Sequence, residues 1–167
     1  MLTTGLAIAL LATAPANPLE ELRKSAEEAR ACSDLVVENG TRVRVYRGDR
    51  ACVAFDDARS YEGVWVYQFE GSRFYEGATS LADLPEPDPR VWFSTDAETQ
   101  WPDAPVERSG RAYRVRFVGR QAADMDRKPL FGYGHFGASA GLVLVDRFEQ
   151  LEDIGSAYGD EEYGPAD

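Results

Sequence analysis

The chain has 167 residues, 44% of them hydrophobic, and a formal net charge of −11 at pH 7. This length allows one domain with a hydrophobic core and leaves too little for a comfortable second one. The acidic balance disfavours binding to nucleic acid or anionic lipid, because a polyanion must meet a basic surface. Seven carboxylates and no Lys or Arg lie between residues 149 and 167. We therefore expect residues 156–167 to form an acidic disordered tail.

The N-terminal residues are typical of a secretory signal peptide. An apolar stretch from Leu6 to about Ala14 is followed by Ala14-Pro15-Ala16, a small-x-small pattern that signal peptidase accepts. We expect cleavage after Ala16, so that residues 17–155 form one globular domain in the periplasm or outside the cell. The apolar run is too short to span a bilayer as a helix, and no transmembrane segment is expected elsewhere.

An amphipathic helix is predicted from Pro18 to about Ala31. Asn17, Pro18 and Glu20 supply an N-cap, a proline at the first helical position and the glutamate of a capping box. Four apolar positions then recur on one face of the helix. These positions are Leu19, Leu22, Ala26 and Ala29.

The two cysteines, Cys32 and Cys52, fit an oxidising compartment. An even number of cysteines there favours one disulfide, worth about 3 kcal/mol on the chain-entropy model. The alternative is a pair of buried thiols. No His or third Cys has metal-ligand spacing to either residue, so we expect no metal site and no cofactor.

Short strands separated by turns dominate the rest of the sequence. Asn39-Gly40 lies between two alternating runs and predicts a β-hairpin. The strands are expected near residues 35–38, 41–47, 51–55, 63–70, 91–94, 113–118 and 142–148. The spacing predicts a mainly β fold, either a small OB-like barrel or a β-sandwich of about six or seven strands, with one N-terminal helix.

Three aromatic side chains alternate along the strand predicted at residues 63–70. Trp65, Tyr67 and Phe69 point to the same side of that strand. On an exposed face they would form a stacking platform for a sugar or a base. The alternative is that they fill the interior of the barrel.

Two Arg-Val-Arg stripes suggest a binding site for anions. Arg42 and Arg44 lie on one predicted strand, and Arg114 and Arg116 lie on another. If these strands are neighbours, the four guanidinium groups would face a common anion. The alternative is a solvated face on which each arginine pairs with a nearby carboxylate.

The segment GASAG, residues 137–141, has the G-x-S-x-G spelling of a serine-hydrolase nucleophile elbow. An elbow needs a strand before the serine and a helix after it, whereas here a glycine-rich loop precedes Ser139 and an alternating β-branched run follows it. The chain's one histidine, His135, lies before the serine rather than after it. We interpret GASAG as a turn that leads into the last strand.

Several segments together resemble a group of short exported bacterial proteins of unknown function. The matching motifs are Gly63-x-Trp65, Phe69-Glu70, Tyr113-Arg114-Val115-Arg116-Phe117-x-Gly119-Arg120, Tyr133-Gly134-His135-x-Gly137 and Val143-x-Val145-Asp146. The resemblance implies an OB-like barrel and export, and it brings no activity or catalytic residue.

The favoured hypothesis is an exported, non-catalytic binding or envelope-associated module whose partner is an envelope protein or a saccharide. Its candidate surface consists of the aromatic triplet and the arginine stripes. One alternative is a small serine hydrolase that uses Ser139 and His135. Another is a protein-interaction or inhibitor module that acts through loops 96–110 and 125–138.

Overall fold

The computed structural model describes residues 17–68, 70–102 and 109–158. The predicted signal peptide, Phe69, part of the loop at 96–110 and residues 159–167 of the predicted tail lie outside the described residues. The chain divides into two compact units, residues 1–46 and 47–167, and each is described by itself.

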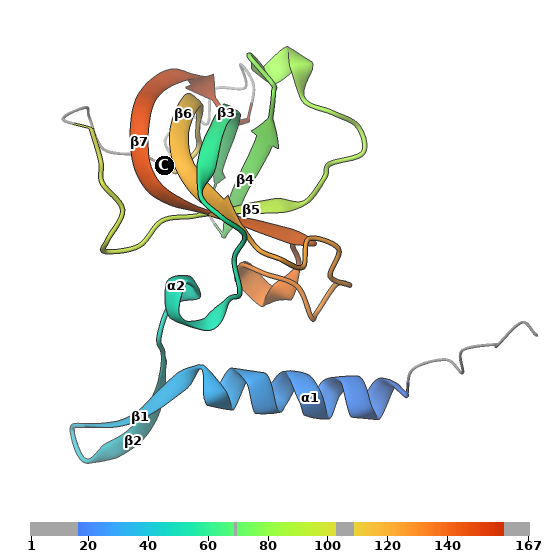
Figure 1. Cartoon of the computed structure of the whole chain (residues 1–167), viewed down its shortest axis with the longest axis vertical. Helices are drawn as coiled ribbons and strands as arrows, with labels where there is room; N and C mark the ends of the chain where they lie inside the picture. The colour runs from blue at the N-terminus through green and yellow to red at the C-terminus, as the bar shows by residue number, and fades with distance from the viewer. Residues whose placement is uncertain (1–16, 69, 103–108, 159–167) are drawn as a thin grey trace, which may run out of the picture. The chain divides into compact units, whose positions relative to one another are not determined.

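The first unit consists of a helix followed by a hairpin (Figure 1). Helix α1 spans Pro18–Ala31, as predicted, and the Asn17 side chain accepts a hydrogen bond from the N–H of Leu19 at 3.1 Å. Strands β1 (Ser33–Glu38) and β2 (Thr41–Tyr46) are antiparallel. The turn between them, Asn39-Gly40, has positive φ at both residues, which explains the Asn-Gly sequence.

The second unit contains a closed five-stranded barrel. Its neighbouring strands follow the order β3-β4-β5-β7-β6, and β6 closes the barrel against β3. Strands β5 and β7 are parallel, and the other neighbours are antiparallel. The strands are β3 (Arg59–Gln68), β4 (Gly71–Glu76), β5 (Val91–Ser94), β6 (Arg111–Gln121) and β7 (Gly141–Ser156). The predicted mainly β fold with an OB-like barrel is confirmed.

Three short helical segments precede or connect these strands. They are α2 (Asp49–Cys52) and the 3-10 helices η1 (Leu81–Asp83) and η2 (His135–Gly137). The strand predicted at residues 51–55 is therefore wrong, since its first half is α2. Strand β4 was not predicted at all.

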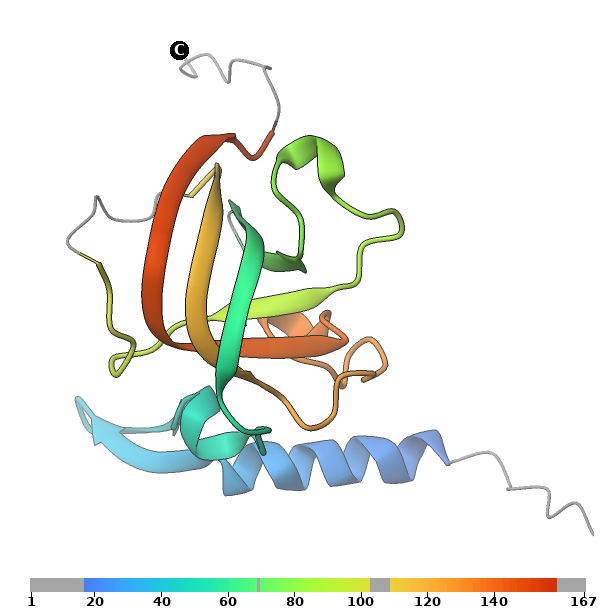
Figure 2. The same cartoon turned by 45° about the horizontal axis from the view of Figure 1, so that its top comes forward.

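Strand β7 is long enough to pair with β5 at its start and with β6 along most of its length. Its first residues lie between β5 and β6, and its later residues continue along β6. Register shifts between β6 and β7 allow the bend that Figure 2 shows in β7. At Gly119, beside one of these shifts, a Cβ atom would lie 2.5 Å from the carbonyl oxygen of Leu144. Glycine is therefore required where the two strands cross so closely.

The barrel interior is filled by aromatic rings. Trp65 is 2% exposed and stacks on Phe93, with ring centroids 4.7 Å apart. The indole N–H of Trp65 donates to Ser72 Oγ at 2.9 Å, and that hydroxyl donates to the Phe93 carbonyl at 2.7 Å. The indole N–H of Trp65 and the hydroxyl of Ser72 are thus both hydrogen-bonded inside the core.

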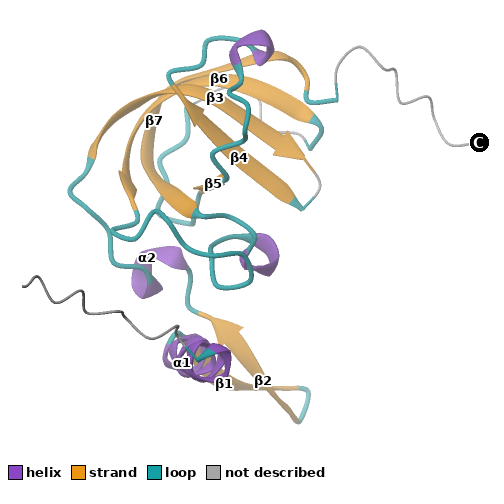
Figure 3. Ribbon diagram, turned by 90° about the vertical axis from the view of Figure 1, so that its right-hand side faces the viewer, coloured by secondary structure: helices purple, strands orange, loops and turns teal. Residues whose placement is uncertain are grey.

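Connecting segments, which Figure 3 draws in teal, pack against parts of the outer side of the barrel. In β7, Val143 and Val145 face the interior, while Leu142 and Leu144 pack outside against the β6–β7 loop. Both faces of this half of β7 are buried, which explains the continuous apolar run GLVLV.

Cys32 and Cys52 are not joined by a disulfide. Cys32 follows α1 in the first unit, and Cys52 ends α2 in the second. The predicted bridge is therefore not formed in the structure.

Candidate functional site

The aromatic triplet does not form a surface platform. Trp65 belongs to the barrel core, and Tyr67 is half-buried with its ring 5.3 Å from that of Trp65. Phe69 lies outside the described residues. The alternation along β3 was read correctly, but the side that carries the aromatic rings faces inward because the barrel closes around it.

The two arginine stripes lie in different sheets. Arg42 and Arg44 are exposed on β2, which pairs with β1 in a two-stranded sheet. Arg114 and Arg116 lie on β6 in the barrel. The two strands are not neighbours, so the condition for a shared site of four guanidinium groups is not met.

The β6 arginines already have carboxylate partners. Arg114 binds Glu152 on β7 through three hydrogen bonds, the shortest of which is 2.8 Å. These bonds hold the pKa of Glu152 below its usual value. Arg116 lies 3.8 Å from Glu149 and donates to Gln150. Their donors are engaged within the barrel, which leaves this stripe a poor anion site.

Ser139 is buried and is not arranged as a nucleophile. It is 1% exposed, and its Oγ accepts a hydrogen bond from Arg73 Nη1 at 3.0 Å. Strand β7 begins two residues later, so a strand rather than a helix follows the serine. Within the described structure, no hydrogen bond joins His135 to Ser139. The elbow geometry is absent, as the sequence context predicted.

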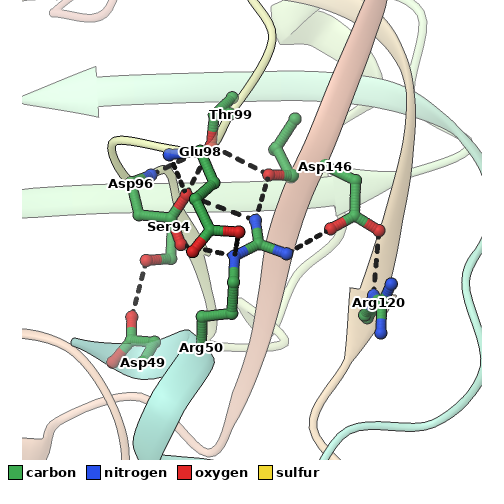
Figure 4. Close-up of polar contacts among 9 residues, drawn as sticks. Asp49, Arg50, Ser94, Asp96, Glu98, Thr99, Arg120 and Asp146 are labelled. Atoms are coloured by element: carbon green, nitrogen blue, oxygen red, sulfur yellow. Dashed lines mark hydrogen bonds and ion pairs between the residues drawn. The ribbon is translucent and has the colours of Figure 1, made fainter. Parts of the chain in front are cut away.

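A polar cluster holds α2 against the barrel (Figure 4). Arg50 Nε and Nη2 donate to the two carboxylate oxygens of Asp96 at 2.8 and 3.2 Å. Its Nη1 donates to Asp146 Oδ1 at 2.6 Å, and Arg120 donates to the other oxygen of Asp146. Asp49, which precedes Arg50 in the chain, accepts a hydrogen bond from the hydroxyl of Ser94. The cluster thus connects α2, β6, β7 and the segment after β5.

The charges in this cluster favour a structural role. Burial, the largest single influence, would raise the pKa of Asp96 and Asp146. The hydrogen bonds and charge of Arg50, joined by those of Arg120 at Asp146 and by the Glu98 N–H and Thr99 at Asp96, together outweigh burial and hold both pKa values below the usual range. Hydrogen bonds to Asp96 raise the pKa of Arg50 further. All three groups are charged at neutral pH, so neither aspartate can act as a general acid. Among the described residues, no group of three or more His, Cys, Asp or Glu side chains could hold a metal ion.

The β6–β7 loop, residues 122–140, presents two large apolar side chains to solvent. Leu130 is 76% exposed and Phe136 is 78% exposed. Both residues have positive φ, 73° and 53°, which is uncommon for residues other than glycine. Such backbone costs about 1–3 kcal/mol for each residue and persists only where its surroundings impose it.

Hydrogen bonds inside the loop impose that conformation. The N–H groups of Leu130 and Gly132 both donate to the carbonyl of Gly137, and Tyr133 and Ser139 exchange two backbone hydrogen bonds. Gly134 packs on the Trp92 ring so closely that a Cβ atom would lie 2.2 Å from it. The exposed side chains are therefore presented by a braced loop.

Residues of β4 and β5 pack beside this loop. Arg73 on β4 is opposite Trp92 on β5. The guanidinium lies 5.9 Å from the Trp92 ring centroid and 3.5 Å from Asp88, in addition to its bond to Ser139. His135 Nε2 lies 3.6 Å from Glu70 Oε1, which brings the β6–β7 loop next to the β3–β4 turn. We call Leu130, Phe136, His135, Arg73 and Trp92 the loop face.

Sequence reasoning missed most of the loop face. It identified His135 and the glycine-rich loop, but it did not single out Leu130, Phe136, Arg73 or Trp92. The run PLFGYGHF, residues 129–136, carried the available signal, since four large apolar residues share a predicted loop with two glycines.

No protein-family model, curated protein or solved structure matches this chain. The resemblance to short exported bacterial proteins therefore stays a prediction. In the described part of the chain, every helix is too short or too polar to cross a membrane.

Proposed function

We propose that this chain is an exported, non-catalytic binding module that holds an envelope protein through the loop face. The observation that carries this proposal is the exposure of Leu130 and Phe136 on a backbone of positive φ. Export rests on the N-terminal sequence, Leu6 to Ala16.

The energetics support a ligand-binding loop. Two strained residues and two solvated apolar side chains destabilise the free protein, and nothing in the barrel core requires them. Burial of each side chain by a partner would recover about 1.5–3 kcal/mol. Exposed apolar residues on a braced loop are the usual anchors of an interface, because little conformational entropy is lost on binding.

The position of the loop supports the same conclusion by analogy with the fold. OB-like barrels bind their ligands with the second and third strands and with the loops that join strands one to two and four to five. The corresponding parts of this barrel are β4, β5, the β3–β4 turn and the β6–β7 loop. A shared fold does not define a ligand, but it indicates which side of the barrel can accept one.

The kind of side chain favours a protein partner over a saccharide. Sugar sites present flat aromatic rings together with polar groups, whereas Leu130 and Phe136 form an aliphatic and aromatic pair. Protein interfaces use such pairs as buried anchors.

The proposal is tested by photocrosslinking in the exporting cell. Benzoylphenylalanine replaces Phe136 in one variant and the exposed Leu22 of α1 in a matched control. We expect a light-dependent adduct with one envelope protein from position 136 and none from position 22. Equal adducts from both positions, or no adduct from position 136, would contradict the proposal.

The hydrolase alternative has a separate test. A fluorophosphonate probe is added to the purified chain and to a Ser139→Ala variant. We expect no covalent label on either, because the Ser139 hydroxyl is buried and bound by Arg73. A label that the variant loses would restore the hydrolase hypothesis.

A further inference from the structure

The first unit lacks a hydrophobic core. None of the side chains described between residues 17 and 46 is buried, and the buried clusters all lie in the barrel unit. On the hairpin, Leu35 and Val37 are 55% and 69% exposed, and Tyr46 is exposed as well. A two-stranded hairpin is only marginally stable in water and needs a third strand or another covering element.

The hairpin also differs from the barrel in how its arginines are paired. Each of the seven arginines on β3–β7 lies within 4.0 Å of a carboxylate oxygen. Among the described residues, Arg42 and Arg44 have no such partner, and Arg44 donates only to Ser33 Oγ at 3.2 Å. Two guanidinium groups on β2 therefore have donors available for an external anion.

The register of the hairpin explains why its own carboxylates do not pair with Arg42 and Arg44. Leu35 is opposite Arg44, and Val37 is opposite Arg42, so one face combines apolar and basic side chains. Asp34 and Glu38 alternate with these residues along β1 and therefore point to the opposite face. We call the first face, with Leu35, Val37, Arg42, Arg44 and Tyr46, the basic hairpin face.

We propose that β2 accepts an acidic, extended segment of a partner protein as a third strand. The two-stranded sheet leaves one edge of β2 unpaired within it, and the main contacts of α1 with the hairpin are made by β1. A strand added along that edge places alternate side chains beside Arg42, Arg44 and Tyr46. Acidic residues two positions apart on the segment then pair with the two arginines.

Charge selects this occupant over a second copy of the same strand. Two β2 strands side by side would bring the arginines of both copies together, which is unfavourable. An acidic segment instead places opposite charges beside the two arginines and neutralises them. The resulting three-stranded sheet supplies the strand that the isolated hairpin lacks.

The test is a binding titration with the full chain lacking residues 1–16. The probe is a synthetic peptide in which glutamate alternates with valine, and a peptide of the same composition with its glutamates in one block is the control. We expect binding of the alternating peptide, weakened by salt. The double change Arg42→Gln and Arg44→Gln should weaken it about tenfold, since each exposed pair contributes up to about 1 kcal/mol.

A matched variant separates position from net charge. Arg23→Gln with Lys24→Gln removes the same two charges from α1 and should leave the affinity unchanged. Equal weakening by both double variants, equal binding of the blocked peptide, or no binding of the alternating peptide would overturn the proposal. A self-associating chain whose dimer survives Arg42→Gln and Arg44→Gln would overturn it too. None of these outcomes involves Phe136, so failure here is distinguishable from failure of the loop face.

Discussion

Strands β2 and β6 carry the same Arg-Val-Arg pattern in two different surroundings. In β6 the strand lies beside β7, whose Glu152 is directly opposite Arg114, and the valine between the arginines is buried in the barrel. In β2 the residues opposite the arginines are Leu35 and Val37, and the valine between them is only half-buried. The pattern alone does not separate an internal ion pair from an available cation, because the neighbouring strand decides between them.

The contrast extends to the whole of each unit. The barrel strands bury most of their aromatic residues and pair their arginines, while the hairpin leaves Tyr46 exposed and its arginines without a carboxylate partner among the described residues. The barrel is therefore expected to determine the stability of the chain, and the hairpin is expected to tolerate substitution.

The largest expected effect comes from the barrel core. Trp65→Ala should lower the free energy of unfolding by about 3–5 kcal/mol, because it empties a packed aromatic site. Leu35→Ala on the hairpin should change it by less than about 0.5 kcal/mol. Chemical denaturation followed by far-ultraviolet circular dichroism measures both values. Similar losses in the two variants would remove the distinction between the units.

A smaller effect is expected at the polar cluster that holds α2 against the barrel. Arg50→Ala leaves Asp96 and Asp146 half-buried without their main donor and should cost about 1–3 kcal/mol. Arg147→Ala is the control, because its pair with Glu149 is more exposed and should contribute less than about 1 kcal/mol. Thermal unfolding of both variants tests this order. An equal loss of stability would show that the cluster contributes no more than an exposed ion pair.

The same cluster predicts a dependence of stability on pH. The folded pKa values of Asp96 and Asp146 lie below their ordinary value of 3.8. The two carboxylates therefore contribute stability that is fully present above that value and is lost as the pH falls through the lowered folded values. Denaturation midpoints measured downward from pH 5 should fall in the wild-type chain and fall less steeply in Arg50→Ala. Parallel curves for the two proteins would count against the assignment.

The smallest effect is expected from single substitutions that compare the two arginine stripes directly. Arg114→Gln breaks an exposed ion pair with Glu152 and should slightly lower the free energy of unfolding at low salt. Arg42→Gln breaks no such pair, so its unfolding free energy should match that of the wild type. The difference should shrink in high salt. An effect of Arg42→Gln as large as that of Arg114→Gln would reveal a partner for Arg42.

Much of the fold could be predicted from sequence because its signals are local. The capping residues of α1, the Asn-Gly turn and the alternation in β3 depend on neighbours within a few positions. The helix at Asp49–Cys52 could not be predicted, because Arg50 is held by Asp96 and Asp146, which are distant in sequence. Strand β4 was missed since both Phe74 and Tyr75 are buried, on opposite sides, which obscures the period of two.

The candidate site was harder to predict for the same reason. Trp65 and Tyr67 were correctly placed on one side of β3, but only closure of the barrel determines that this side is the inside. The loop face joins β4, β5 and the β6–β7 loop, whose pairing is not local. Phe136 became a candidate only when its exposure and its positive φ were both known.

The most direct test of the binding module is the affinity of the envelope protein identified by crosslinking for variants of the loop face. Asparagine adopts positive φ more readily than most residues, so Phe136→Asn with Leu130→Asn removes the apolar anchors and preserves the backbone. We expect this variant to lose at least about a hundredfold in affinity, since two buried anchors contribute about 1.5–3 kcal/mol each, and to keep an unchanged unfolding midpoint. Unchanged affinity in that variant would contradict it.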